Sequence, residues 1–191
     1  MLACKYPHIF QPIKVGKLTL KNRITNAPTY NFLASYDNHV TREQIESSKP
    51  VGAGGAATVT MGSGFINNIL PPAARHIVGM SDEWIVTYLS EWCEAVKRHG
   101  AKACVELVPI ASYFGTHEVE SSVGIPMEID CNLLSLQELQ GYIADYAKAA
   151  RHVLKADGDM VLIHGAHCQL PALLFSKVFN KRLDQYGPQS F

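Results

Sequence analysis

The chain has 191 residues, with 17 basic and 17 acidic side chains and 47% hydrophobic residues. These values are typical of one globular domain, and zero net charge argues against an electrostatic nucleic-acid binder. No run of about 18 apolar residues predicts a transmembrane helix, and we expect no secretory leader and no membrane partner. The five cysteines contain no C-x-x-C pair, which favours free thiols in a reducing cytoplasm over a disulfide framework.

The first third of the sequence predicts a hairpin, a strand and a helix. Residues 13–20 alternate apolar and polar side chains around Gly16-Lys17, as β-hairpins do. Residues 23–28 are a short candidate strand. Thr41-Arg-Glu-Gln44 is a capping-box sequence and predicts the start of a helix.

The remaining sequence predicts three more strands, separated by two helices. Apolar runs at 56–62, 102–108 and 159–163 predict the strands. Ser81-Asp-Glu83 predicts the start of a helix that ends at Gly100, and residues 109–134 read as a long loop. Ser135-Leu-Gln-Glu138 is a second capping box and predicts a helix to Asp157-Gly158. The apolar stripes of the two helices place these side chains in the core: Ile85, Tyr88, Leu89, Trp92, Val96, Leu136, Leu139, Ile143, Tyr146, Ala150 and Val153.

Strands that alternate with helices predict a parallel sheet with right-handed crossovers. A barrel is favoured over an open doubly wound sheet because no G-x-G-x-x-G follows the first strand. Polar side chains also follow the ends of all four strands, at the face where barrels build active sites. We therefore predict an α/β fold, a partial (β/α)8 TIM barrel of about the first four β/α units with an N-terminal β-hairpin. The polar positions are Thr25, Asn26, Thr60, Ser63, Glu106, His164 and His167.

Several segments carry family motifs in a fixed order. Residues 10–24 resemble the N-terminal hairpin and first strand of a known family. Asn26-Ala-Pro-Thr29 resembles the turn after that strand, and residues 53–60 resemble its second strand. Residues 163–170 resemble the motif I-H-x-A-H-G-Y-L, and residues 180–187 resemble N-x-R-x-D-x-Y-G. With these motifs the chain resembles the old yellow enzyme superfamily, on the side of the 2,4-dienoyl-CoA reductase type of NADH:flavin oxidoreductase.

The resemblance implies an FMN-dependent NAD(P)H oxidoreductase of the ene-reductase type. Its small-molecule substrate would be an α,β-unsaturated carbonyl or enoyl thioester, whose carbonyl oxygen His164 and His167 bind while enolate charge grows there. The flavin would contact Glu106 and the segment Asn26, Ala27, Pro28, Thr29, together with Thr60. Glu106 matches a position that is usually Gln. A carboxylate there can only accept hydrogen bonds, and its charge disfavours the anionic reduced flavin.

Four departures from the family pattern bear on the chemistry. The proton-donating Tyr is replaced by Gln169, and the Gly before it by Cys168. The H-x-G-R after the third strand reads Pro109-Ile-Ala-Ser112, and the second Gly of Y-G-G is Pro188. Since an amide is no practical acid at neutral pH, the proton must have another source. Tyr30 and Tyr113 are candidate replacements.

The length predicts an incomplete barrel, because a (β/α)8 barrel needs about 250 residues and takes its phosphate site from the loops after strands seven and eight. We expect residues 1–191 to be one domain, the N-terminal half of the barrel, apparently truncated. A 4Fe-4S cluster is expected only in a longer protein. Open strand edges predict self-association, so a homo-oligomer is expected. An inactive, self-associating half-barrel is the alternative function, and an open flavodoxin-like module is a third.

The site residues also have structural interpretations. His164 and His167 could simply be hydrogen-bonded at a strand end; a zinc site is a further option, but no third ligand lies at local spacing, so no metal is expected. Glu106 could face the flavin or pair with a Lys or Arg. Cys168 is expected to be a small buried residue in place of Gly. A structural hydrogen-bonded cluster is expected to hold the loop after the fourth strand, formed by Asn180, Arg182, Asp184 and Tyr186.

Overall fold

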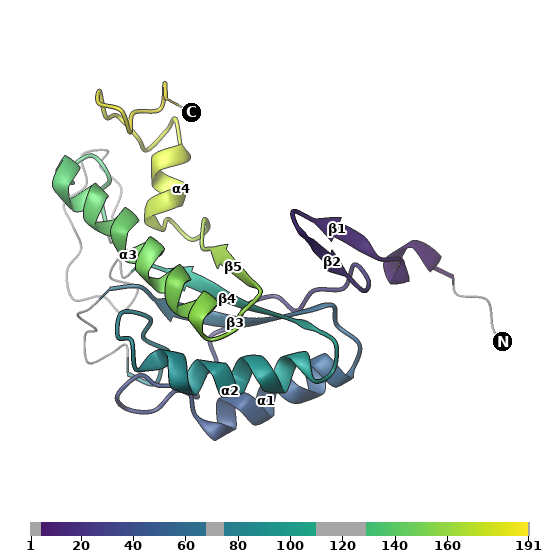
Figure 1. Cartoon of the computed structure of the whole chain (residues 1–191). Helices are drawn as coiled ribbons and strands as arrows, with labels where there is room; N and C mark the ends of the chain where they lie inside the picture. Colours follow the sequence, from purple (N-terminus) through teal and green to yellow (C-terminus); the bar gives the residue numbers. More distant parts are fainter. Residues whose placement is uncertain (1–4, 68–74, 110–128, 191) are drawn as a thin grey trace.

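The structure is a computed structural model and describes residues 5–67, 75–109 and 129–190 (Figure 1). Tyr113, the segment 110–112 and most of the predicted long loop lie outside the described residues. The elements, in chain order, are the 3₁₀ helix η1 (Pro7–Phe10), β1 (Ile13–Val15), β2 (Leu18–Leu20), α1 (Arg42–Ala53), β3 (Thr58–Phe65), α2 (Ile85–Lys97), β4 (Lys102–Val108), α3 (Leu136–Lys155), β5 (Met160–Ile163) and α4 (Leu170–Phe175).

The main sheet contains β3, β4 and β5 in sequential order, and both pairings are parallel. Helix α2 connects β3 to β4 and helix α3 connects β4 to β5, so the chain repeats β/α units as a TIM barrel does. The sheet does not close on itself within the described residues, which confirms the predicted partial barrel. A sequential strand order contradicts the flavodoxin-like alternative. The predicted hairpin is confirmed as β1–β2, with Gly16 at φ +58° in its turn, and it stands away from the sheet (Figure 1).

The core lies between the sheet and the helices. Val59, Met61, Ala103, Val105 and Leu107 are buried there against apolar side chains of α2 and α3. Successive side chains of a strand point to opposite faces, so the intervening residues occupy the other face of the sheet. That second face carries the polar side chains Thr58, Thr60, Cys104 and Glu106.

The candidate strand at residues 23–28 is wrong as a strand. Thr25 makes only an isolated parallel bridge to Thr58, and two backbone hydrogen bonds join the segment to β3, Ala57 N to Ile24 O and Asn26 N to Thr58 O. Pro28 has no N–H to extend the ladder, so the segment stays extended beside β3 without becoming a full strand.

Helix α2 begins three residues later than the sequence predicts. The carboxylate of Asp82 accepts from Trp84 N, and regular helix starts at Ile85 with no side-chain cap. Ile85, Leu89, Trp92 and Val96 are buried as predicted. Tyr88 is not a core residue: it is 42% exposed, and its ring stacks on His39 at 4.8 Å because it flanks the apolar stripe.

The capping box at Ser135 is confirmed, with hydrogen bonds in both directions between Ser135 and Glu138. The stripe of α3 is less buried than predicted, because Leu136 and Ile143 are largely exposed. Ile143 lies at the edge of an apolar cavity of about 220 Å³ between α3 and α4. Only the middle and end of this stripe therefore pack on the sheet.

The segment after α4 is held by the predicted polar cluster. The Asn180 amide donates to the carbonyls of Leu174 and Tyr186, both at 2.7 Å. The nearly buried Arg182 guanidinium donates to Cys131 O and Leu134 O and forms an ion pair with Asp184. The cluster thus fastens residues 174–186 to the segment before α3.

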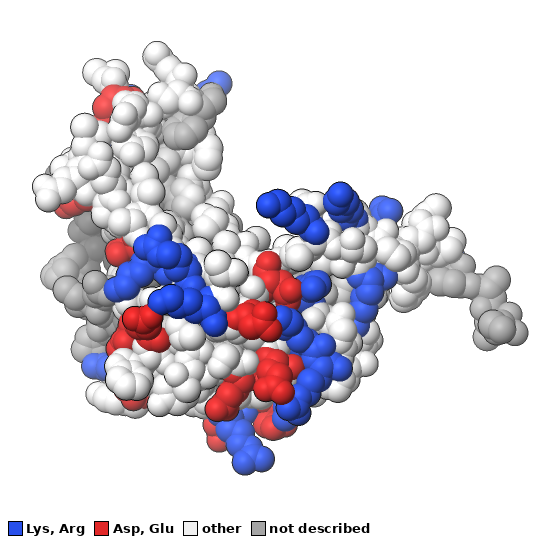
Figure 2. Space-filling model, in the orientation of Figure 1, with Lys and Arg blue, Asp and Glu red and all other residues white. Residues whose placement is uncertain are grey.

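The surface charges are mixed. Figure 2 shows Lys and Arg interspersed with Asp and Glu over the helices, while the region around α4 is nearly free of charge. A basic stripe of the kind that binds nucleic acid is not visible on this face. Among the described residues, no helix is long and apolar enough to cross a membrane.

Candidate active site

A bulge in β3 changes the backbone geometry of this strand next to Glu106. The register with β4 shifts between Met61 and Gly64, and Ser63 takes a left-handed backbone conformation at φ +63°. A bulge re-aims the groups of the bulged strand, and here it directs the Ser63 N–H to the Glu106 carboxylate at 3.2 Å. The sequence places Ser63 at a strand end but does not predict this contact; the glycines on either side, Gly62 and Gly64, are the available signal for the bulge.

Glu106 joins the two histidines of the strand-end motif. Its side chain is on β4 and nearly buried, and its Oε1 accepts a hydrogen bond from His164 Nδ1 at 2.8 Å. His164 Nε2 lies 3.2 Å from His167 Nδ1. Since β4 and β5 are parallel and adjacent, their carboxyl ends bring together residues 58 positions apart. We call these three side chains the carboxylate–imidazole relay.

The backbone after β5 is strained at the relay. His167 and Cys168 both have left-handed conformations, φ +52° and +55°, which cost L-residues about 1 kcal/mol or more each. Cys168 thus adopts a conformation suited to glycine, but it is exposed, so the prediction of a small buried residue is wrong. Gln169 is 1% exposed, and its Oε1 has no hydrogen-bond partner among the described residues.

The Cys104 thiol and the Tyr146 hydroxyl near Glu106 are neutral at physiological pH. Burial raises the pKa of the Cys104 thiol to about 11, despite its hydrogen bond with Thr60. Burial also raises the pKa of the Tyr146 hydroxyl, and the charge of Glu106 adds to this effect. The Glu106 carboxyl is the acidic group in contact with His164. The expectation that Glu106 could pair with a Lys or Arg is wrong, since its side-chain partner is an imidazole.

Most of the predicted flavin-contacting residues line one polar cavity of about 180 Å³. Asn26, Ala27, Thr29 and Thr60 contribute to its wall, together with Gln44, Ser47 and Ser48 of α1. Pro28 is half-buried and is not among the lining residues. Gly62 also lines this cavity, and the next residue, Ser63, contacts Glu106 of the relay.

Gly62 permits the close approach of the segment 26–29 to β3. A Cβ at position 62 would lie 2.4 Å from Thr29 O and 2.5 Å from Thr29 N. We expect Gly62→Ala to destabilise the fold by about 1–3 kcal/mol through this overlap. Gly141→Ala is the control: nothing lies within 4 Å of its Cβ position on α3, so it should stabilise by about 1 kcal/mol. Denaturant unfolding of both variants measures the difference, and equal effects would contradict it.

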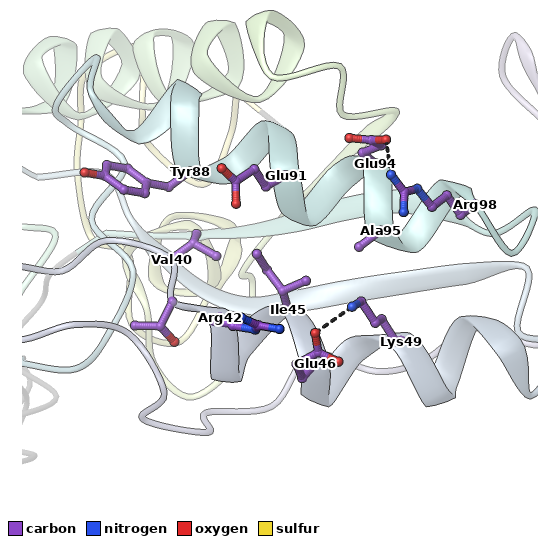
Figure 3. A pocket seen from close by; sticks show the side chains of 11 residues that line it. Val40, Arg42, Ile45, Glu46, Lys49, Tyr88, Glu91, Glu94, Ala95 and Arg98 are labelled. Carbon is purple, nitrogen blue, oxygen red and sulfur yellow. Dashed lines mark hydrogen bonds and ion pairs between the residues drawn. The ribbon is translucent and has the colours of Figure 1, made fainter.

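A larger groove, of about 560 Å³, lies away from the site between α1 and α2 (Figure 3). Four of its six charged side chains pair with one another, Lys49 with Glu46 and Arg98 with Glu94. They do not converge on a common point, so the groove carries no recognisable ligand chemistry. Among the described residues, no group of three potential metal ligands is present.

Tyr30, one of the two candidate replacement acids, lies beside aromatic side chains. Its ring is 6.0 Å from that of Phe32 and 6.4 Å from that of Phe65. Tyr30 packs against the buried cluster of Phe65, Ile77 and Val108.

The parallel β/α units and the relay at their carboxyl ends define the class: a partial α/β barrel with a polar cluster at the strand ends. The model of the NADH:flavin oxidoreductase / NADH oxidase family matches residues 8–190. The chain belongs to this family, which confirms the resemblance in its sequence.

Similar proteins include an aldehyde reductase and a cinnamate reductase. The chain is 29% identical over 196 residues to a chanoclavine-I aldehyde reductase of Penicillium roqueforti, covering 95% of this chain and 51% of that protein. It is 28% identical over 200 residues to a cinnamate reductase of Clostridium sporogenes, covering 96% and 30%. The chain thus spans about half or less of the length of these relatives.

Solved structures show the same fold. A morphinone reductase in complex with tetrahydroNAD superposes with a TM-score of 0.72 at 25% identity, covering 95% of this chain and 55% of that one. A 2-naphthoyl-CoA reductase superposes with a TM-score of 0.78 at 21% identity, covering 95% and 31%. The second likeness concerns the fold alone.

Proposed function

We propose that the protein is an FMN-dependent NAD(P)H oxidoreductase that reduces the C=C bond of an α,β-unsaturated carbonyl or enoyl thioester. The observation that carries the proposal is the His164–His167 pair at the carboxyl end of β5, backed by Glu106. A relative named for cinnamate, an unsaturated acid, and one named for an aldehyde support this substrate class. The four cysteines among the described residues are free thiols, which supports a cytoplasmic location.

The residues present fit the polar edge of a flavin. The ring offers an N–H donor and carbonyl acceptors, so its site needs both kinds of group. Glu106 would accept, while Asn26, Thr29 and Thr60 would donate. Thr58 Oγ1 and Ser63 Oγ are buried and have no partner among the described residues, so two hydroxyls on this face of the sheet are available to a ligand. When bound, the flavin supplies the hydride.

The histidine pair binds the substrate carbonyl in this proposal. Negative charge grows on the carbonyl oxygen as hydride reaches the β-carbon, and a positioned N–H donor stabilises that charge. His167 is largely exposed, at the outer end of the relay, and therefore meets the substrate. Glu106, through its bond to His164 Nδ1, orients that ring and sets its tautomer.

The test is FMN binding and NADH consumption by the purified protein. FMN should co-elute with the protein, and NADH oxidation should depend on cinnamaldehyde. The saturated analogue 3-phenylpropanal is the matched control, because it has the carbonyl but no conjugated C=C bond. A folded protein that binds no FMN, or that consumes NADH equally with both aldehydes, would contradict the proposal.

The second candidate is a self-associating half-barrel without catalytic activity. The observation in its favour is the outer strand β5, where Val161, Leu162 and Ile163 are 38%, 42% and 47% exposed. β5 pairs with β4 on one side only among the described residues, and apolar side chains on a strand with an open edge favour pairing with another copy. Sedimentation of the FMN-free protein should then show a dimer or larger species, and Leu162→Lys should return it to a monomer. A monomeric wild type would contradict this candidate.

A further inference from the structure

The polar cavity beside α1 has a buried carboxamide in its wall. Gln44 lines this cavity and is 3% exposed. Its hydrogen bonds to other side chains in the described part of the chain all use its backbone: N donates to Thr41 Oγ1, and O accepts from Ser47 and Ser48. The predicted capping box at Thr41 therefore forms only in part, and the Gln44 carboxamide has no partner there. A buried amide without partners is costly, so this side chain is suited to a ligand that supplies them.

The two serines in the same wall have their hydrogen bonds within the protein. Ser48 Oγ accepts from Trp92 Nε1 at 2.9 Å and donates to Gln44 O at 3.1 Å. Ser47 Oγ donates to the same carbonyl at 2.8 Å. Ser48 is buried, whereas Ser47 is exposed and so lies at the mouth of the cavity. A ligand that enters past Ser47 therefore meets the Gln44 carboxamide at the inner wall.

The cavity lies where the segment 26–29 and β3 separate. The hydrogen bond from Asn26 N to Thr58 O is the last between their backbones in the described residues, so the strands are not held together beyond it. Val51, which lines the cavity, packs against the core between the sheet and the helices. The wall from α1 is thus on the helix side of the sheet, whereas Glu106, the proposed flavin partner, is on the opposite face.

The size of the cavity limits the ligand to one ring. Its volume is about 180 Å³, and an apolar cavity of about 150 Å³ holds benzene, so one six-membered ring with small substituents fits. Gln44 also borders a second cavity of about 10 Å³, which has room for one water at most. The larger cavity is therefore the one that can take an organic ligand.

The lining defines the chemistry of that ligand. No charged side chain is among the described lining residues, and a charged ligand would lose its hydration without a counter-charge. The polar lining consists of amides and hydroxyls: Asn26, Thr29, Asn31, Gln44, Ser47, Ser48 and Thr60. A carboxamide has both a donor and an acceptor, so its best complement is a second amide that presents N–H and C=O side by side.

We propose that this cavity binds an uncharged one-ring amide, whose N–H and C=O pair with the carboxamide of Gln44. The amide group is part of the ring in uracil and a substituent of the ring in benzamide, and both compounds offer the same pair of hydrogen-bonding groups. Binding changes no covalent bond and uses neither His164 nor His167. The inference is therefore independent of the proposed function.

Trp92 reports on the cavity because its Nε1 donates to Ser48. In ¹⁵N-tryptophan-labelled protein without FMN, uracil or benzamide should shift the indole N–H signal of Trp92 in a saturable manner. The signal of Trp84, which is 72% exposed, should not move, and Trp84→Phe assigns the two signals. Benzoate is the matched control ligand, because it has the shape of benzamide and a negative charge, and it should cause no shift. A response to one amide alone shows whether the amide group has to lie within the ring or on it.

Gln44→Leu keeps the approximate size of the side chain and removes its amide. The dissociation constant should rise at least about tenfold, because two hydrogen bonds to the ligand are lost. Ser47→Phe, at an exposed position, fills the mouth of the cavity and should abolish the shift; it decides the test if Gln44→Leu does not fold. Gln140→Leu, at an exposed position of α3, is the control and should bind as the wild type does.

Three results would overturn the inference: no shift of the Trp92 signal with either amide, equal shifts with benzamide and benzoate, or wild-type affinity in both Gln44→Leu and Ser47→Phe. Displacement of the amide by FMN would also overturn it, since the cavity would then belong to the flavin site. A protein that binds the amide but no FMN refutes only the proposed function. A protein that binds FMN but neither amide refutes only the amide site.

Discussion

In the FMN-loaded protein, His164→Asn should lower kcat/KM for reduction of cinnamaldehyde by about 10²–10³-fold. The Asn amide nitrogen can take the place of Nδ1 and keep the hydrogen bond to Glu106, so the buried carboxylate retains a partner. The variant has no counterpart of Nε2, and the link to His167 is lost. The measurement is kcat/KM per bound FMN, so a change in flavin content does not enter the comparison.

His99→Asn is the control for this substitution. His99 is exposed after α2 and far from the relay in sequence and fold, so its replacement should leave kcat/KM unchanged. A His164→Asn variant that binds FMN and keeps kcat/KM within threefold of wild type would show that the pair does not stabilise the developing enolate.

Arg182→Ala should destabilise the protein by about 3–5 kcal/mol. The side chain of Arg182 is 6% exposed, and it donates to Cys131 O at 2.6 Å and Leu134 O at 2.5 Å besides its ion pair with Asp184. Its removal leaves these acceptors without their donor and frees the segment after α4. Urea unfolding measures the loss. Arg151→Ala, at an exposed position of α3, should change stability by about 0.5 kcal/mol or less, and similar losses in the two variants would contradict the structural role of Arg182.

The same ion pair predicts a dependence of stability on pH. The hydrogen bond from Arg182 is the main cause that lowers the pKa of the Asp184 carboxyl below its ordinary value of 3.8. A carboxyl whose folded pKa is lowered stabilises the protein above its unfolded pKa, and this contribution is lost as the pH falls through the folded value. Wild-type stability should therefore fall more steeply below pH 4 than that of Arg182→Ala. If the unfolding free energies of the two proteins fall by the same amount between pH 5 and pH 3, this prediction is contradicted.

Local sequence patterns determined the secondary structure and the order of the sheet. The capping box at Ser135 and the apolar run at residues 102–108, which is buried almost throughout, depend on neighbours within a few positions, so they could be predicted directly. The motif after β5 likewise identified His164 and His167 as site residues. The segment 23–28 was misjudged because a strand needs a ladder of partners, and whether Pro28 interrupts it is decided by the neighbouring β3.

The contacts that give these residues a chemical role were decided by the tertiary structure. Glu106 meets His164 because β4 and β5 pair in parallel register, and the Ser63 N–H reaches that carboxylate because β3 bulges between Met61 and Gly64. Neither the register nor the bulge is set by residues near Glu106 in sequence. The sequence by itself thus determined which polar side chains stand at strand ends. Only the packing of the strands decided which of these side chains form hydrogen bonds with one another.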